Sequence, residues 1–129
     1  MSKKIKPTES ELAILQILWE SEPATVRFVN DELNKHRDVG YTTTLKIMQL
    51  MLTKDLVSRN KAGRKHLYTS VFKETETQNV LLDKFLKTTF KGSAMKLVMQ
   101  ALGNHQTSKD ELNQIKALIQ KIEKDEQNN

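Results

Sequence analysis

The chain has 129 residues, of which 37% are hydrophobic and 5% aromatic, with four glycines, two prolines and no cysteine. This length fits one domain, or a small domain with an appendage, and the few glycines and prolines favour helices over a turn-rich sandwich or barrel. The lack of cysteine excludes disulfides, a thiol nucleophile and a cysteine-ligated metal. No apolar run approaches the ~18 residues of a membrane span, and the charged N-terminus has no apolar stretch behind it. We therefore expect a soluble, cytoplasmic protein without a signal peptide.

The charge is unevenly distributed. The net charge is +5, and residues 1–73 carry all of the excess, because residues 74–129 hold equal numbers of basic and acidic side chains. The segment from Arg59 to His66 contains four Lys or Arg residues and no acid. Such a segment is typical of a surface that binds a polyanion, although a single basic run is more often a solvated loop. The neighbouring elements must decide between these two interpretations.

Three helices are predicted in the first half of the chain. The first begins with a capping box from Thr8 to Glu11 and ends before Glu22-Pro23, because the residue before proline avoids the helical region. The second is capped by Thr25 and carries apolar residues at helical spacing up to Leu33. After a polar turn over 34–40, a third helix is expected from near Thr42 to about Lys54.

A β-hairpin is predicted next. The stretches 56–59 and 66–71 are rich in β-formers and flank Lys61-Ala62-Gly63-Arg64, whose glycine suits a tight hairpin turn. Three helices followed by a hairpin is the order of a winged helix-turn-helix, with the third helix in the DNA major groove and the hairpin as the wing. We assign residues 1–73 to this DNA-binding domain.

Residues 74–129 are predicted to form three more helices, so the fold class is mainly α. The first of them ends near Lys91-Gly92, the second ends at Gly103, and the third opens with a capping pattern at Ser108. Such a small neutral region would form a marginal core alone, because short fragments bury too little surface. We expect it to be a dimerisation domain in preference to part of a monomer.

The exposed positions of the third helix carry hydroxyl, amide and ammonium groups that can read base edges or contact phosphates. They are Thr42, Thr43, Lys46, Gln49, Thr53 and Lys54. The alternative is that Thr42 only caps the helix and that Lys46 and Gln49 only solvate its surface. The predicted phosphate contacts of the wing are Arg59, Lys61, Arg64, Lys65 and His66.

Apolar positions in the last three helices are the candidate dimer contacts. They are Leu82, Phe85, Leu86 and Phe90, together with a coiled-coil-like seam of Leu112, Ile115, Ile119 and Ile122. Trp19 and the methionines Met48 and Met51 are expected in the core. The three histidines are too scattered for a metal site, and no enzyme motif is present, so we expect no catalytic residue, metal or cofactor.

The ordered series of motifs resembles the penicillinase-repressor (BlaI/MecI) family of transcriptional regulators. The resemblance runs from about Thr8 to Glu123 and rests on four segments taken together: residues 11–19, Pro23-Ala24-Thr25-Val26, residues 40–45 and residues 63–68. It implies a homodimer whose winged-helix heads bind a palindromic DNA operator and repress transcription. It also implies relief of repression by a regulatory protease that cleaves the dimerisation region. The family's Asn-Phe cleavage site falls at Gln100-Ala101, where this chain departs from the pattern.

Two other functions remain open on the residues alone. One is a winged-helix module that binds proteins, with an incidental basic wing, and the other is non-specific nucleic-acid binding. A steep salt dependence of DNA affinity would exclude the protein-binding module, and a large ratio of specific to non-specific affinity would exclude the non-specific binder.

Overall fold

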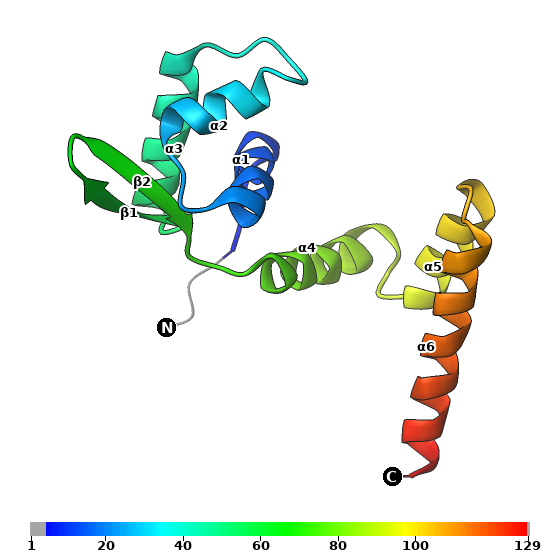
Figure 1. The fold of residues 1–129 in the computed structure, drawn as a ribbon. Coiled ribbons are helices and arrows are strands. Elements are labelled where there is room, and N and C mark those ends of the chain that lie inside the picture. Colours follow the sequence, from blue (N-terminus) through cyan, green and yellow to red (C-terminus); the bar gives the residue numbers. More distant parts are fainter. Residues whose placement is uncertain (1–4, 129) are drawn as a thin grey trace. The chain divides into compact units, whose positions relative to one another are not determined.

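The computed structural model describes residues 5–128 and is mainly helical with one hairpin, as expected (Figure 1). Three helices, α1 (Glu9–Ser21), α2 (Val26–Leu33) and α3 (Tyr41–Thr53), precede the strands β1 (Val57–Ala62) and β2 (Lys65–Ser70). The helices α4 (Glu74–Thr89), α5 (Ala94–Asn104) and α6 (Lys109–Gln127) follow. No helix within the described residues is both long and apolar enough to cross a membrane.

The chain divides into two compact units, one reaching Lys84 and the other starting at Phe85, so the division falls inside α4. We call the first unit the head and the second the C-terminal unit. The domain boundary predicted after residue 73 lies immediately before α4 and stays a prediction.

The starts of the first two helices follow the local signals in the sequence. Thr8 and Glu11 form the predicted capping box, in which each side chain accepts a hydrogen bond from the backbone of the other residue. The helix α1 ends at Ser21, directly before the cis Glu22–Pro23 bond. Thr25 caps α2 by accepting from the Phe28 amide. These caps satisfy backbone N–H groups that have no partner within the helix.

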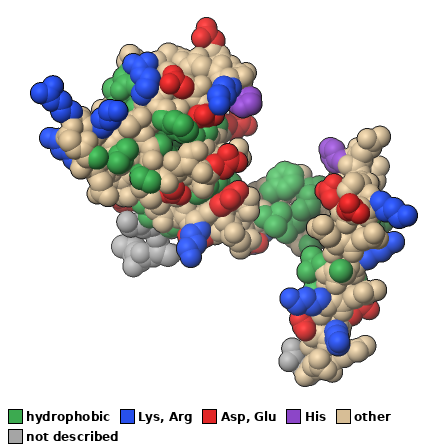
Figure 2. Space-filling model, viewed as in Figure 1, with side chains coloured by type: hydrophobic (Ala, Val, Ile, Leu, Met, Phe, Trp, Pro, Cys, Tyr) green, Lys and Arg blue, Asp and Glu red, His purple; other side chains and the backbone are tan. Residues whose placement is uncertain are grey.

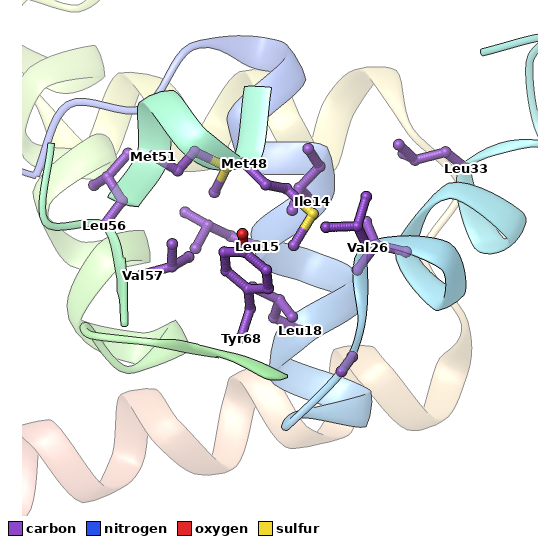
Figure 3. Packing of buried hydrophobic residues seen from close by; sticks show 12 residues of the cluster. Ile14, Leu15, Leu18, Val26, Leu33, Met48, Met51, Leu56, Val57 and Tyr68 are labelled. Carbon is purple, nitrogen blue, oxygen red and sulfur yellow. The ribbon is translucent and has the colours of Figure 1, made fainter. Parts of the chain in front are cut away.

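One hydrophobic core holds the head together (Figure 3). Side chains from α1, α2, α3 and the wing, the hairpin formed by β1 and β2, converge on it. Its buried members include Ile14, Leu15, Leu18, Val26, Val29, Leu33, Met48, Met51, Leu56, Val57 and Tyr68. The predicted core roles of Met48 and Met51 are confirmed. Trp19 packs at the edge of this core, and its indole N–H donates to the Phe72 carbonyl at 3.1 Å.

Two asparagines fix the turn that joins α2 to α3. The buried Asn30 amide donates to the Val39 carbonyl at 3.0 Å and to the Thr44 hydroxyl at 2.8 Å. The Asn34 side chain accepts from the Val39 amide and donates to the Val39 carbonyl. Because Thr44 lies in the first turn of α3, this network sets how α3 leaves the turn.

The wing is a regular antiparallel hairpin that joins the rest of the head through a short bridge. Its register pairs Ala62 with Lys65, which leaves Gly63 and Arg64 as the two-residue turn. Gly63 has φ +66°, the positive value expected of a glycine at the first position of a type II′ turn. The strands extend nearer the turn than predicted. Ala24 exchanges two backbone hydrogen bonds with Tyr68, which the sequence did not indicate.

The C-terminal unit contains the end of α4 with α5 and α6. Lys91 and Gly92 have positive φ values after the end of α4, where the sequence predicted a stop. The helix α5 continues through Gly103 to Asn104, so the predicted end at Gly103 was one residue early. Ser93 and Ser108 cap α5 and α6. The rings of Phe85 and Phe90 meet edge to face with their centroids 5.6 Å apart.

Candidate nucleic-acid interface

The exposed face of α3 presents a polar surface to solvent. Thr42, Thr43, Lys46 and Gln49 are all exposed, whereas Thr44, Met48 and Met51 lie on the buried side of the helix. The helix begins at Tyr41 with Gly40 at its N-cap position and no side-chain cap. Thr42 is therefore not the N-cap that the alternative interpretation made it. Its hydroxyl lies in the first turn, on the same exposed side as Lys46.

A cleft of about 530 Å³ separates α3 from the wing. Its lining includes Arg27, Tyr41 and Gln49 from the helices and Arg59, Arg64, Lys65 and His66 from the wing. None of the residues that line it is acidic. The structure thus brings Gln49 and four of the five predicted wing residues together around one cationic cleft, where several positive charges attract a polyanion more strongly than one alone. Lys61 does not line the cleft.

The predicted wing residues are all exposed along the hairpin, and Figure 2 shows Lys and Arg side chains over this part of the head. Because strand side chains alternate between the two faces of a hairpin, residues at successive positions point to opposite sides. Arg64 lies in the turn itself, outside the paired residues of the two strands.

Two residues of the cleft, Arg27 and Tyr41, were not predicted from the sequence. The Arg27 guanidinium lies over the Tyr41 ring, 4.6 Å from its centroid, and both side chains line the cleft. Arg27 is the second residue of α2 and Tyr41 the first of α3. The signal that could have found them was the only basic residue of α2, together with the aromatic residue directly before the threonines.

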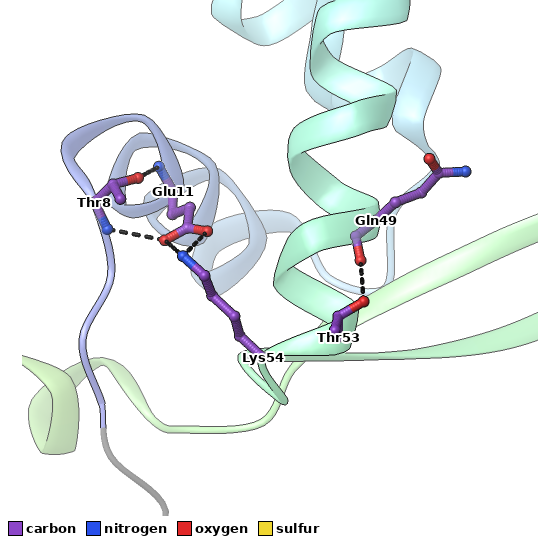
Figure 4. A network of polar contacts seen from close by, with 5 residues as sticks. All are labelled: Thr8, Glu11, Gln49, Thr53 and Lys54. Carbon is purple, nitrogen blue, oxygen red and sulfur yellow. Dashed lines mark hydrogen bonds and ion pairs between the residues drawn. The ribbon is translucent and has the colours of Figure 1, made fainter.

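Two of the predicted α3 contacts are already engaged within the head (Figure 4). The Lys54 ammonium donates to both carboxylate oxygens of Glu11, at 2.9 and 3.1 Å. Lys54 follows the last residue of α3 and joins the end of this helix to the start of α1. The Thr53 hydroxyl donates to the Gln49 carbonyl one turn earlier, at 3.2 Å. Lys54 and Thr53 thus each have a partner within the head, and their predicted contacts with DNA stay predictions.

Glu11 is buried, so its charge depends on these partners. Burial raises the pKa of Glu11, but the hydrogen bond from the Thr8 amide and the Lys54 ammonium together lower it by more. The pKa of this carboxyl therefore lies below its usual value, and Glu11 is ionised at neutral pH. An ionised carboxylate in this position keeps Lys54 attached to α1.

The predicted dimer contacts keep much of their apolar surface in solvent. Leu82 and Phe85 on α4 are exposed, as are Leu112, Ile119 and Ile122 on α6, whereas Leu86, Phe90 and Ile115 are partly buried. The candidate cleavage residues Gln100 and Ala101 are exposed but lie inside α5. No group of three or more possible metal ligands occurs in the described part of the chain.

The sequence model of the family described as "Penicillinase repressor" matches residues 7–121. The chain belongs to this family. The match covers the head and most of the C-terminal unit, so it includes both parts of the molecule. Membership of a repressor family agrees with the expectation that the chain is not an enzyme.

Named relatives of the penicillinase repressor family are similar to this chain over different lengths. The penicillinase repressor of Bacillus licheniformis is 23% identical over 120 residues, which cover 93% of this chain and 94% of that protein. The transcriptional regulator BlaI of Mycobacterium tuberculosis is 36% identical over 72 residues, 55% of this chain and 52% of its own length. The match with this relative thus spans about half of each protein.

Solved structures share the fold of the head. The solution structure of the DNA-binding domain of the repressor BlaI has a TM-score of 0.51 with 24% identity, covering 58% of this chain and 93% of that one. The monomeric form of Bacillus licheniformis BlaI, solved in complex with the blaP half-operator, has a TM-score of 0.50 with 24% identity. It likewise covers 58% of this chain and 93% of that one. The predicted winged helix-turn-helix fold is therefore confirmed.

Proposed function

We propose that the chain is a sequence-specific transcriptional repressor that binds double-stranded DNA as a homodimer, with α3 in the major groove and the wing on the phosphate backbone. One observation carries this proposal: the base-reading candidate Gln49 and four cationic residues, Arg27, Arg59, Arg64 and Lys65, line a single cleft without an acidic residue. Base edges and phosphates lie within one helix radius of each other on B-DNA, so a reader needs both kinds of group side by side.

The relatives support the same function. Two of them are named as repressors or transcriptional regulators, and one solved relative of the same fold was studied on a half-operator. A half-operator implies a second half, and a twofold-symmetric dimer fits two such halves. The exposed apolar residues of α4 and α6 are the surface that we assign to self-association.

Relief of repression follows from this arrangement if α6 is needed for the dimer. Cleavage at Gln100–Ala101 would separate α6 from the head, because both residues precede the helix in the chain. The site lies within α5, so a regulatory protease would have to unwind part of that helix first. Loss of the dimer would then weaken operator binding, since the second head would no longer bind within one molecule.

Selection of bound duplexes from random-sequence DNA by the full-length chain tests the proposal. We expect one preferred sequence with two related half-sites, bound at least ~10³-fold more tightly than unrelated DNA. The affinity should fall steeply with salt concentration, since phosphate contacts release counterions. Binding that does not depend on salt would favour the protein-binding module. Salt-dependent binding without a preferred sequence would favour a non-specific nucleic-acid binder.

A further inference from the structure

The exposed face of α3 contains one large apolar side chain that the proposed contacts do not use. Leu50 is 51% exposed, more than any other large hydrophobic residue described up to Lys84. Met48 and Met51, two residues before it and one residue after it, are fully buried, so the helix turns Leu50 away from the core. About half of its apolar surface stays in water, where contact with an apolar partner would be favourable.

Leu50 lies among the proposed DNA contacts. It follows Lys46 by four residues and precedes Thr53 by three, and residues at these spacings are neighbours on one helix face. Gln49 follows Lys46 by three residues and lines the cleft between α3 and the wing. Leu50 does not line that cleft, so Gln49 and Leu50 flank Lys46 on its two sides.

The polar side chains that follow Leu50 already have partners within the head. The Lys54 ammonium is bound to Glu11, and the Thr53 hydroxyl donates to the Gln49 carbonyl. Gln49 and the exposed polar residues before it can read hydrogen-bonding base edges, whereas Leu50 offers an apolar surface. In the major groove, the only apolar group of the four bases is the 5-methyl group of thymine.

We infer that Leu50 is a specificity-determining residue that selects a thymine at one position in each half-site by packing against its 5-methyl group. The inference rests on the proposed function and adds to it a readout by apolar contact. Burial of one methyl group favours thymine over a base without it by about four-fold, which corresponds to ~0.8 kcal/mol.

Replacement of thymine by uracil tests this directly, because it removes the methyl group and leaves the base pairing unchanged. The probe is the tightest-binding duplex from the random-sequence selection, with each thymine of one half-site replaced in turn. For the unsubstituted protein we expect one replacement per half-site to weaken binding by about three- to five-fold. Leu50→Ala should bind the thymine duplex more weakly and lose the uracil penalty at that position only.

Two control variants separate packing from general effects. Leu50→Met keeps an apolar side chain of similar volume and should retain the uracil penalty. Val71→Ala shortens another exposed apolar residue of the head, which is 42% exposed and outside the interface, and should leave all affinities unchanged. Thermal unfolding of each variant checks that the head stays folded.

The outcomes distinguish this inference from the function on which it rests. A selected sequence without a fixed thymine, an absent uracil penalty, or a penalty that persists in Leu50→Ala would overturn the inference while leaving the repressor function standing. Failure to select any preferred sequence would overturn both.

Discussion

The Arg27 guanidinium stacks on the Tyr41 ring, 4.6 Å from its centroid, and so links the first turn of α2 to the first residue of α3. Both side chains face the cleft between α3 and the wing. A cation held over an aromatic face loses little mobility when it binds an anion, since the ring already restricts the side chain. This pair therefore places a fixed positive charge where the DNA backbone is expected to pass.

Replacement of Arg27 tests this role. Arg27→Ala should weaken binding to all duplexes alike and flatten the dependence of log affinity on log salt concentration by about one unit, as expected for one lost phosphate contact. Tyr41→Leu should have a smaller effect, because the charge remains but its support is lost, and Tyr41→Phe should behave as the unsubstituted protein. Arg37→Ala, which removes an exposed arginine outside the cleft, is the matched control. Equal salt slopes for Arg27→Ala and Arg37→Ala would contradict the assignment.

Lys46 and Gln49 are expected to read bases. Alanine at either position should cost about 1–3 kcal/mol on the preferred operator and relax the preference at one base position per half-site. The measurement is titration of the operator and of its single-base variants by fluorescence anisotropy. If the loss were the same on every sequence, these side chains would be phosphate contacts instead.

Arg64 and Lys65 on the wing are expected to contact phosphates. Removal of either side chain should weaken binding to specific and unrelated duplexes by the same factor and flatten the salt slope by about one unit. Lys73→Ala removes an exposed lysine beyond the wing and serves as the control. An unchanged salt slope in both wing variants would exclude the wing as a DNA contact.

The ion pair between Glu11 and Lys54 should stabilise the head in a pH-dependent way. Lys54→Met leaves the buried Glu11 carboxylate without its cation, and we expect the free energy of unfolding at pH 7 to fall by about 1–2 kcal/mol, because the half-exposed ammonium is partly screened. The pKa of Glu11 is lowered in the folded state, so this stabilisation is complete above the unfolded pKa and is lost as the pH falls through the folded pKa.

Urea unfolding at neutral and strongly acidic pH measures this effect. The difference between the unsubstituted protein and Lys54→Met should shrink in acid, where Glu11 is protonated in both. Lys35→Met breaks the more exposed Lys35–Glu32 pair, whose atoms lie 3.0 Å apart, and should change the free energy of unfolding little. A difference that stays constant down to acidic pH would show that Lys54 acts through packing and not through its charge.

The apolar seam of α6 is expected to hold the dimer. Ile119→Glu combined with Ile122→Glu places two charges on this seam, and sedimentation should show a shift toward monomer. Operator affinity should fall by about 10²–10⁴-fold, because the second head no longer binds within one molecule. Ala117→Glu adds a charge on the opposite side of the same helix and should leave the dimer intact.

The same surface can be tested by shortening the chain. A protein that ends at Gln100 lacks α6 and should sediment as a monomer, while the head keeps its helical signal and its salt-dependent binding. If this shortened protein stayed dimeric, or bound the full operator as tightly as the intact chain, the dimer contact would lie elsewhere and cleavage in α5 would have no basis as a switch.

Most element boundaries and the fold class could be predicted from the sequence, because their causes are local. The Thr8–Glu11 capping box, the stop at Glu22-Pro23 and Gly63 in the hairpin turn each act within a few residues. The apolar spacing likewise separated the core methionines from the exposed polar face of α3. The site could be predicted as a set of exposed residues, since helical spacing determines which side chains share a face.

Contacts between residues far apart in the chain depended instead on how the elements pack. Lys54 has no partner close in the sequence, and it pairs with Glu11, 43 residues earlier. Arg27 and Tyr41 lie 14 residues apart, and only the packing of α2 against α3 brings the guanidinium over the ring. The segments that become helices, the segments that form the wing and the place of the positive charge could be predicted without the structure, because those properties depend on neighbouring residues. Which charges stay free to bind DNA was decided by packing, because an ion pair or a stacked ring forms only when distant segments are brought within a few ångströms of each other.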